Sequence, residues 1–502
     1  MQDSDLTLSS PLSTPENNDS ALLCLTILWH PEAKRIGEQA LMLGENLELA
    51  RFTPLFCKPQ QDGLGLGHGG ISREPLRFTR DSNHGVKLSL PNSRMVVELN
   101  GREVQGMHYL SFEQICAGAI LCLGRAVLLC LHWMHSLPKG NALPGIIGVG
   151  DAAIKLRDLI RQVAPTESAV LLLGETGTGK EVAARAIHQL SLRAAQNMVC
   201  VNMAALNESL AAADLFGAAK GAYTGAQSAR LGFFQEADSG SLFLDEIGNA
   251  PTSVQPMLLR VLETADYRPL GATRDVRANA RIIAATDQDL YDGSFNPALL
   301  RRLESFIVHL PPLRTRREDI GLLILHFLSE LNQGNLAETS LPIKLVSQFA
   351  IYDWPGNIRQ LRHILKRTLL SLKMGDMPSF AKLVEVPALR SMTAQHSAGI
   401  TPISNSNPRK KLSDIDAQDV LAAMENNDWM IQAAAQELHI SRPSMYKLLE
   451  AHPQIRRIDQ ITPAEIEHAW QQTAGDVENC ASQLKTPVDA LRRFLRSKGC
   501  LS

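Results

Sequence analysis

The middle of the chain alternates short apolar runs with amphipathic stretches. Three runs are fully or almost fully apolar, at residues 171–173, 241–244 and 281–285. Such runs predict strands buried on both faces, as in a parallel sheet. Helical periodicity then dominates residues 322–331 and 358–372. We therefore predict an α/β domain at residues 151–312 and a helical region at residues 313–374.

The first part of the chain has a different pattern. Residues 1–20 are rich in Ser, Asn, Asp and Pro, which predicts a disordered tail. Residues 21–136 contain short runs with a period of two, divided by Gly, Pro and Asn, and this pattern predicts a β-sandwich. Gly and Pro between residues 137 and 150 predict a linker.

One apolar stretch, Ile115–Met134, is long enough to cross a membrane. Arg125 lies in its middle, where a charged side chain would cost roughly 3 kcal/mol. Together with Gly124 it divides the stretch into two pieces of strand length. Two buried strands joined by a tight turn are the better prediction. The N-terminus has no basic segment followed by an apolar core, so we expect no signal peptide.

The C-terminal part, residues 413–500, contains an internal repeat that follows a polar linker at residues 375–412. In the second half of each copy the pattern predicts helix, turn, helix. The two copies share an apolar skeleton at a constant offset, in the pairs Val420 and Ile466, Met424 and Trp470, Ala434 and Cys480, Leu438 and Leu484, Met445 and Leu491, Leu449 and Leu495. The predicted fold is thus multidomain: an N-terminal β-sandwich, a central α/β domain with a helical lid, and a C-terminal all-α region.

Composition and charge narrow the class of protein. The 502 residues are 45% apolar, which is typical of a globular chain of about three domains. A net charge of −2 excludes a chain that is basic throughout, so any contact with nucleic acid must be confined to one module. The eight cysteines form no C-x-x-C pair, and we expect reduced thiols in a cytoplasmic protein.

The apolar run at residues 171–173 breaks into a glycine-rich turn that ends in lysine. Glycines at this spacing let successive backbone N–H groups face phosphate oxygens, and Lys180 supplies positive charge. The helix predicted at residues 180–190 adds the positive end of its dipole. We interpret the turn as a P-loop for a nucleoside triphosphate, with the binding residues Gly174, Glu175, Thr176, Gly177, Thr178, Gly179, Lys180 and Glu181.

Two further strand ends carry polar residues suited to phosphate chemistry. The run at residues 241–244 ends in Asp245 and Glu246, and parallel sheets bind ligands at the carboxyl ends of their strands. Asp245 would hold Mg²⁺, while Glu246 would orient and activate the attacking water. Thr286 and Asp287 end the third run, where the γ-phosphate would lie. The expected cofactors are ATP and Mg²⁺.

Seven motifs follow one another in order through this region. They are GETGTGKE (174–181), VNMAAL (201–206), DLFGAAKGAYTGA (214–226), GSLFLDEIG (240–248), LLRVLE (258–263), LPPLRTRREDI (310–320) and WPGNIRQLRH (354–363). Together they resemble the bacterial sigma-54-dependent enhancer-binding proteins, a branch of the AAA+ ATPases. The resemblance implies ATP hydrolysis, a helical lid at residues 313–374, and a Glu that normally follows the P-loop lysine, as Glu181 does here.

The motif at residues 221–226 is similar to the surface loop with which this family grips the sigma-54 factor. Its glycines permit a tight reversal around one aromatic ring and one hydroxyl group. The family usually has Phe where this chain has Tyr223, and Ala218 and Ala219 replace polar residues common before the loop. The resemblance implies contact with sigma-54 RNA polymerase through Gly221, Ala222, Tyr223, Thr224, Gly225 and Ala226.

The resemblance also implies roles for single residues near the nucleotide. Asn202 matches the asparagine that restrains the catalytic glutamate, and Thr286 matches the first sensor of the family. Arg359 matches the second sensor, which reaches the phosphates from the lid. Asp287 stands where the family usually has Asn, so how this sensor distinguishes ATP from ADP is left open.

Arginines supplied in trans are a further implication. Arg302 matches a family arginine that acts on the nucleotide of the neighbouring subunit, where such a group raises the rate by several orders of magnitude. This implies self-association into a hexameric or similar ring. Asn296 stands where a second arginine is usual, and whether Arg301 substitutes for it is open.

The predicted sandwich resembles a forkhead-associated domain, a module that binds phosphothreonine. The residues that carry this resemblance include Arg35, Ser72, Arg73 and Asn100, which would be the phosphopeptide candidates. The family normally has Arg where this chain has Glu38, and a carboxylate repels a phosphate. Either Arg35 substitutes for it, or the domain serves only protein contacts.

The C-terminal repeat resembles the Fis-type helix-turn-helix that ends many members of the enhancer-binding family. In the first copy Ser441 is placed to cap a helix that begins at Arg442. The resemblance implies enhancer DNA as a partner, bound by Arg442, Ser444, Tyr446 and Lys447. The second copy, with Arg492, Arg493 and Arg496, is either a second DNA-binding unit or a packing partner.

The function expected from these observations is that of a sigma-54-dependent transcription activator with a ring-forming ATPase. Two other classes are open: a AAA+ ATPase that remodels a protein without specific DNA binding, and a phosphothreonine-reading adaptor with a weakened ATPase. Asn296, Asp287 and the pair Ala218–Ala219 favour the adaptor slightly, and measurable ATP turnover would exclude it.

Overall fold

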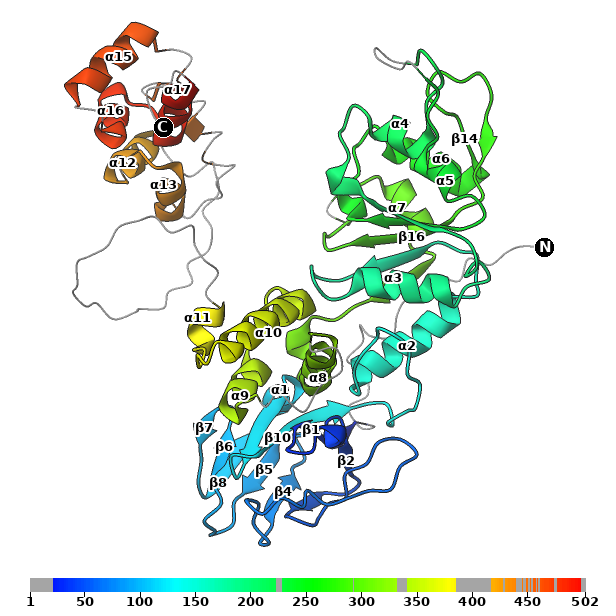
Figure 1. The fold of residues 1–502 in the computed structure, drawn as a ribbon, viewed down its shortest axis with the longest axis vertical. Helices are drawn as coiled ribbons and strands as arrows, with labels where there is room; N and C mark the ends of the chain where they lie inside the picture. The colour runs from blue at the N-terminus through cyan, green and yellow to red at the C-terminus, as the bar shows by residue number, and fades with distance from the viewer. Residues whose placement is uncertain are drawn as a thin grey trace. The chain divides into compact units, whose positions relative to one another are not determined.

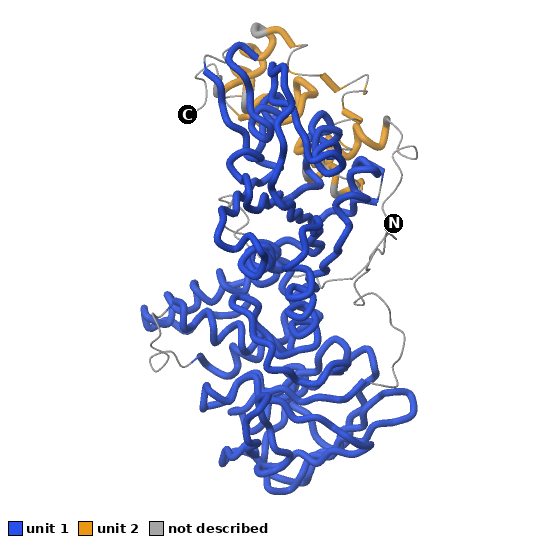
Figure 2. The backbone as a smooth tube through the Cα atoms, turned by 90° about the vertical axis from the view of Figure 1, so that its right-hand side faces the viewer, with its two compact units in different colours: residues 1–390 blue, residues 391–502 orange. Residues whose placement is uncertain are grey.

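The computed structural model divides the chain into two compact units, residues 1–390 and 391–502 (Figure 2). It describes residues 21–384, apart from residues 223–227, 292 and 332–340. In the second unit it describes much of residues 417–497, apart from residues 428, 439–444, 446–447, 450–451, 453–454, 457, 459–460 and 474–475.

The N-terminal β-domain, residues 21–135, consists of two packed antiparallel sheets (Figure 1). Their facing side chains form one core, from Leu25 and Phe78 to Leu129. One sheet has the order β2 (Gln39–Met42), β1 (Leu22–Trp29), β10 (Val127–Met134), β9 (Ala119–Leu123), β6 (Val97–Leu99), β7 (Arg102–Glu103). The other has the order β3 (Asn46–Leu49), β4 (Leu76–Arg80), β5 (Val86–Ser89), β8 (Met107–Leu110).

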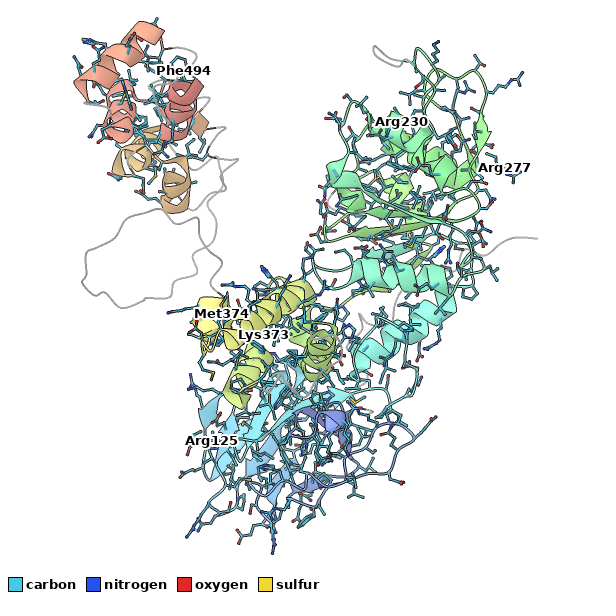
Figure 3. All side chains as sticks on the ribbon, viewed as in Figure 1. Arg125, Arg230, Arg277, Lys373, Met374 and Phe494 are labelled. Carbon is cyan, nitrogen blue, oxygen red and sulfur yellow. The ribbon has the colours of Figure 1, made fainter. Side chains whose placement is uncertain are left out.

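The long apolar stretch belongs to the first of these sheets. β9 and β10 pair as a hairpin, and Gly124 and Arg125, with φ of 56° and 50°, form the predicted tight turn. Arg125 projects from the end of this hairpin in Figure 3. The structure differs from the prediction at the start of the stretch. Residues 115 and 116 end the short helix α1 (Phe112–Cys116), which is capped by Ser111, and are not part of a strand. Among the described residues, no helix is long and apolar enough to cross a membrane.

The central α/β domain contains a five-stranded parallel sheet. Its order is β12 (Met198–Asn202), β13 (Ser241–Asp245), β16 (Arg281–Thr286), β11 (Val170–Leu173), β17 (Phe306–His309). All three predicted runs are therefore neighbouring strands, as their apolar composition indicated. Its helices are α2 (Asp151–Val163), α3 (Lys180–Gln189), α4 (Ala211–Phe216), α5 (Phe233–Glu236), α6 (Gln255–Thr264) and α7 (Pro297–Leu303), with a small β14 (Asp266–Tyr267) and β15 (Val276–Arg277) hairpin.

The helical lid follows the sheet and packs around Phe349, Trp354 and Leu365. Its helices are α8 (Ile320–Leu331), α9 (Ile343–Ile351), α10 (Asn357–Lys373) and α11 (Phe380–Val384). The last helix, α11, follows Pro378 and Ser379 and buries Leu383 in the lid core. The lid therefore extends beyond residue 374, and the predicted start of the linker at residue 375 is too early.

The second unit is helical, with α12 (Ala417–Asn426), α13 (Ile431–Glu437), α15 (Pro463–Gln472), α16 (Val477–Leu484) and α17 (Val488–Ser497). α12 and α15 occupy equivalent positions in the repeat, as do α13 and α16. Ten of the twelve skeleton residues are buried in a single hydrophobic core, and the other two, Leu438 and Trp470, pack against it. The two copies are therefore packed together rather than folded as separate modules.

Candidate nucleotide-binding site

The predicted P-loop connects the end of β11 to the start of α3. Gly177 and Gly179 have φ of 83° and 104°, which side chains with a Cβ rarely adopt. The turn folds back on itself, and the Lys180 ammonium donates to the carbonyl oxygens of Gly174 and Glu175 at 2.5 and 3.2 Å. Lys180 thus lies inside the turn, where a phosphate would compete for its hydrogen bonds.

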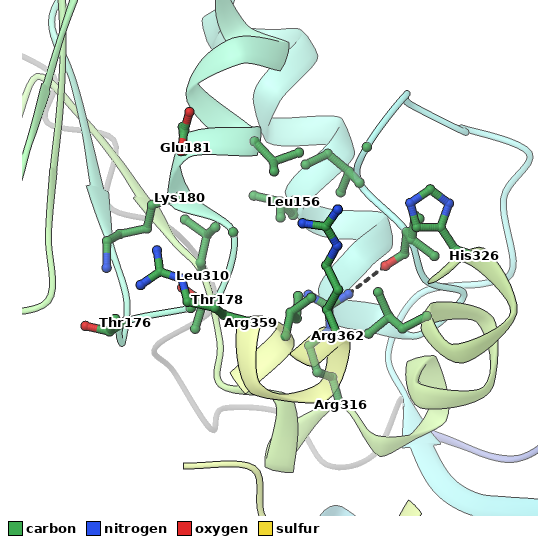
Figure 4. A pocket seen from close by; sticks show the side chains of 18 of the residues that line it. Leu156, Thr176, Thr178, Lys180, Glu181, Leu310, Arg316, His326, Arg359 and Arg362 are labelled. Atoms are coloured by element: carbon green, nitrogen blue, oxygen red, sulfur yellow. Dashed lines mark hydrogen bonds between the residues drawn. The ribbon is translucent and has the colours of Figure 1, made fainter. Parts of the chain in front are cut away.

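The carboxylates predicted from the strand ends lie at the same cavity as Lys180. Asp245 ends β13, and its Oδ1 accepts the backbone N–H of Glu246 at 3.0 Å. Burial lowers the pKa of Lys180, while the charges of Asp287, Asp245 and Glu246 act in the opposite direction. Figure 4 shows Lys180 and Thr176 at the cavity.

The polar residues at the neighbouring strand ends make local hydrogen bonds. Thr286 is buried and accepts the backbone N–H of Gln288 at 3.1 Å. Asp287 accepts the hydroxyl of the P-loop residue Thr176 at 2.5 Å. Asn202 lies beside Asp245 in the sheet register, and its side chain accepts the backbone N–H of Ala204 at 2.9 Å.

The lid contacts the P-loop directly. The carbonyl oxygen of Gly177 accepts the backbone N–H groups of Ile358 and Arg359, at 3.0 and 3.3 Å. Arg359, the predicted second sensor, also lines the cavity. These hydrogen bonds join the first turn of α10 to the tip of the P-loop.

Two lid residues that the sequence did not single out hold Glu175. The guanidinium of Arg314 and the amide of Asn357 both donate to its carboxylate. These hydrogen bonds, that from Arg314 foremost, lower the pKa of Glu175 to about 2. Glu175 is therefore ionised, and its carboxylate is anchored to the lid while its carbonyl oxygen accepts from Lys180.

The cavity, of about 440 Å³, extends from the phosphate-binding turn to an apolar end (Figure 4). Its apolar lining has Ile146 and Ile147 from the linker, Leu156, Leu310, Leu323 and Phe327. At the rim Arg362 donates to Glu330, and its guanidinium lies over the Phe327 ring. An elongated cavity with a basic, glycine-rich end and an apolar end suits a nucleotide. Sequence reasoning did not identify the apolar end, whose residues are dispersed along the chain.

The predicted trans-acting residues lie outside this cavity. Asn296 caps α7, because its side chain accepts the backbone N–H groups of Ala298 and Leu299 at 2.9 and 3.2 Å. Arg302 is exposed at the end of α7 and faces Glu263 at 3.5 Å. Arg301 is also exposed. The structure therefore gives Asn296 a local role that arginine could not fill.

The predicted sigma-54 loop is described only at its base. Gly221 and Ala222 are described, whereas Tyr223, Thr224, Gly225 and Ala226 lie outside the described residues. Ala218 is buried and pairs with Arg230 on one side and Leu270 on the other. A small side chain at residue 218 therefore fits a position between two backbone segments.

The phosphopeptide candidates mostly serve the fold of the β-domain. Arg35 is only 3% exposed and donates to the Glu38 carboxylate at 2.9 and 2.7 Å. Its other donors bind the carbonyl oxygens of residues 64–66. Asn100 accepts the N–H of Ile120 at 2.8 Å, and Ser72 accepts that of Glu74 at 3.0 Å. Arg73 and Asn100 are exposed, but Arg35 is buried and its donors are occupied, so the structure does not assemble the four into an open anion site.

The candidate DNA-binding residues Arg442, Ser444, Tyr446 and Lys447 all lie outside the described residues. In the second copy Arg492 is exposed on α17.

Comparison with known proteins identifies the central region. Residues 146–309 match the model of the sigma-54 interaction domain, and residues 314–397 match an AAA+ ATPase lid domain. The chain is 41% identical over 289 residues to the DNA-binding transcriptional activator HyfR of Escherichia coli K12, covering 54% of this chain and 43% of that protein. It is 38% identical over 315 residues to the transcriptional regulatory protein ZraR of Salmonella typhi, covering 62% and 69%.

A solved structure, NtrX from Brucella abortus in complex with ADP, is similar at 28% identity and a TM-score of 0.44, over 70% of this chain and 69% of that chain. The chain spans less than half the length of HyfR.

Proposed function

This chain belongs to the sigma-54-dependent transcriptional regulators, whose central domain is of the AAA+ ATPase class, and we propose that it hydrolyses ATP to activate transcription by the sigma-54 RNA polymerase. The observation that carries the proposal is one cavity lined by the P-loop, the acidic pair and a lid arginine. These residues come from strand ends and a helix far apart in the chain.

Each residue has a proposed task in hydrolysis. Lys180 and the backbone of residues 174–179 bind the phosphates, and Arg359 reaches them from the lid. Glu246 orients the attacking water and accepts its proton, while Asn202 restrains Glu246 until ATP is in place. Thr286 lies at the end of β16, where it senses the γ-phosphate.

Asp245 fits Mg²⁺, because its carboxylate ends a strand at the cavity and oxygen atoms are the ligands this ion prefers. Bound there, the ion would neutralise the charge that develops on the transferred phosphoryl group. Asp245 also holds the backbone N–H of Glu246, so the same side chain orients the segment that carries the catalytic carboxylate.

The active form is proposed to be a hexameric or similar ring. Arg302 is exposed and lies outside the cavity of its own chain, as a residue that acts on a neighbour must. Arg301, one residue earlier on the same exposed surface, is the proposed substitute for the arginine missing at Asn296. Isolated chains would then hydrolyse ATP slowly.

We propose that ATP hydrolysis by the central domain exerts force on sigma-54 through residues 221–226. Binding to enhancer DNA through Arg442, Ser444, Tyr446 and Lys447 would hold the ring near its promoter. The common core of the two C-terminal copies supports one DNA-binding unit built from both, rather than two independent ones. Phosphothreonine binding is not part of the proposal, because Arg35 is buried against Glu38.

The test is ATP hydrolysis measured against protein concentration, for the parent chain and for Glu246→Gln. We expect turnover per chain to rise steeply with concentration and to vanish in the variant, which should still bind ATP. Turnover independent of concentration would contradict the ring. No turnover at any concentration would favour the adaptor class. In that class Asn296 would serve only as the cap of α7, without the arginine that the family usually has at this position.

A further inference from the structure

Three strands of the N-terminal β-domain are buried on both faces. β1, β9 and β10 are almost continuously buried, whereas β4 and β5 of the opposite sheet alternate buried and exposed side chains. An antiparallel sheet usually leaves one face in water, and then its strands alternate. Continuous burial in this sheet means that something covers its outer face.

The lid covers that face. Leu28 of β1, Ile120 of β9 and Leu128 of β10 belong to the same hydrophobic core as Ile324 of α8 and Phe349 of α9. In Figure 1 the two helices lie against these strands. Beside this contact, Cys24 and Met134 of the β-domain pack on Ile154 of α2. The β-domain therefore shares apolar cores with both parts of the nucleotide-binding domain.

The approach between the two domains is closest at Gly321. A Cβ atom at this residue would lie 2.1 Å from the carbonyl oxygen of Leu28, so only glycine lets the first turn of α8 rest on the backbone of β1. One residue later the Leu322 side chain lies over Gly37, where a Cβ atom would be 2.9 Å from it. The interface is packed backbone against backbone and leaves no space for an added methyl group.

The linker fastens the same junction with polar contacts. Its N–H groups at Val149 and Gly150 donate to the buried carboxylate of Asp319, at 2.7 and 2.9 Å. Arg316 bridges Asp319 and the carbonyl oxygen of Ile147, both at 2.8 Å. The residues between the two domains are thus bound to the start of α8.

α8 has a second face that belongs to the nucleotide cavity. Leu323, His326, Phe327 and Glu330 line the cavity, and Figure 4 shows His326 at its edge. Gly321 and Leu322 contact the β-domain instead. A shift of the β-domain would move α8, and with it the wall of the cavity that receives the apolar part of the nucleotide.

We propose that the N-terminal β-domain stays docked on the helical lid, and that Gly321 and Leu322 are positioning residues through which the β-domain sets the affinity of the site for nucleotide. The β-domain is then not a tethered module that swings away from the motor. Its influence on the motor passes through the position of α8. The affinity part of this proposal rests on the proposed nucleotide binding, whereas the docking part does not.

The docking part is tested by cutting the chain. A protease site inserted between the exposed residues Lys139 and Gly140 allows cleavage in the otherwise intact protein. We expect the two pieces to elute together in size-exclusion chromatography, as the uncut protein with the same insertion does. Elution of residues 1–139 as a separate species would overturn the proposal.

The affinity part is tested by two variants and a matched control, with equilibrium binding of a fluorescent ADP analogue and hydrogen exchange as readouts. Gly321→Ala should weaken ADP binding about tenfold, in line with the cost of overpacking a close contact. Leu322→Ala, which creates no clash, should weaken it in the same direction. Gly44→Ala should change nothing, because no atom of a described residue lies within 4 Å of the added methyl group.

Amide exchange should rise in both α8 and β1 for the two interface variants, which a purely local defect in α8 would not produce. Unchanged ADP affinity in Leu322→Ala and Gly321→Ala, with the parent binding ADP normally, would overturn the positioning role. Failure of the parent to bind ADP would instead count against the proposed function, while the elution test would still decide the docking.

Discussion

The guanidinium of Arg314 donates two hydrogen bonds to the carboxylate of Glu175, at 2.8 and 2.5 Å. Glu175 belongs to the P-loop and Arg314 to the start of the lid, so this ion pair connects the two parts of the nucleotide site. Asn357 adds a third hydrogen bond at 3.1 Å and binds the carbonyl oxygen of Thr176 as well. The lid and the phosphate-binding turn are therefore linked before any contact with nucleotide.

Glu175→Gln should loosen this link and weaken ADP binding. The two side chains are about two-fifths exposed, so water screens the pair, and we expect an effect of about 1 kcal/mol, or roughly fivefold in Kd. A fluorescent ADP analogue at equilibrium measures it. Glu48→Gln, which removes a comparable exposed ion pair in the β-domain, is the control and should have no effect.

The pH dependence of this effect follows from the pKa of Glu175. A carboxyl group whose pKa is lowered by folding stabilises the folded form at every pH above the pKa that it has in the unfolded chain. This contribution is lost as the pH falls from about 4.5 toward about 2. The ratio of ADP affinities between the parent and Glu175→Gln should thus be the same at about pH 5 and about pH 7. A ratio that approaches one at about pH 5 would contradict the arrangement.

Asp287→Asn should strengthen nucleotide binding. The Asp287 carboxylate accepts the Thr176 hydroxyl group and acts on the Lys180 charge, so it holds negative charge where phosphates would bind. Asn keeps a hydrogen-bond acceptor and removes that charge, and we expect ATP and ADP to bind about fivefold more tightly at low ionic strength. Binding titrations at two salt concentrations test this, because added salt should shrink the difference.

The control for Asp287→Asn is Asp238→Asn, which removes an exposed carboxylate that does not line the cavity. Weaker binding by Asp287→Asn would mean that its charge supports the site through Lys180 instead of competing with phosphate.

The sequence predicted the frame of the site because strand ends and turns are local features. The runs at residues 171–173, 241–244 and 281–285 form neighbouring strands, and their polar ends meet at the cavity as parallel-sheet geometry requires. Arg314 and Asn357 were missed because each depends on a partner more than a hundred residues away. In the sequence, Arg314 is one of several arginines in LRTRR and resembles solvated surface.

The contact between the β-domain and the lid is reflected in the sequence by strands that do not alternate. Leu22–Trp29, Ala119–Leu123 and Val127–Met134 are almost entirely apolar, whereas β4 and β5 alternate buried and exposed side chains. A β-sandwich accounts for one buried face of these strands and leaves the burial of the other face unexplained. Similarly, Arg35 was considered as a phosphate ligand, although Glu38 lies three residues later and satisfies it. Residue type alone does not show which side chains form contacts of these two kinds.

Asn296 should be needed for the stability of α7. Asn296→Ala removes the hydrogen bonds to the N–H groups of Ala298 and Leu299, and an N-cap of this kind contributes about 1 kcal/mol. Asn296→Arg should cost about the same, because arginine cannot accept these hydrogen bonds. Asn296→Asp should keep the cap and complement the helix dipole. The measurement is amide exchange within residues 297–303; equal losses for Asn296→Ala and Asn296→Asp would contradict the cap.

Glu318 should make the junction between the linker and the lid sensitive to pH. The side chain is buried against the backbone of Gly150, where a Cβ atom would lie 1.9 Å from its carboxyl oxygen. Burial first, and then the negative charge of Asp319, raise the pKa of Glu318 to about 8; Asp151 adds to the rise and Arg316 opposes it. The raised pKa favours the protonated carboxyl group in the folded protein.

A carboxyl with a raised pKa binds a proton in the folded chain that the unfolded chain has already released. The stability of the junction should therefore fall as the pH rises from about 4.5 to about 8, by at most about 1.4 kcal/mol per pH unit for this one proton, and level off above. Glu318→Gln cannot lose that proton, so its amide exchange in α8 should change less between about pH 6 and about pH 8 than that of the parent, after correction for the intrinsic rate. Equal pH slopes in the two proteins would show that Glu318 is already ionised at its place beside Gly150, and that Arg316 outweighs the burial.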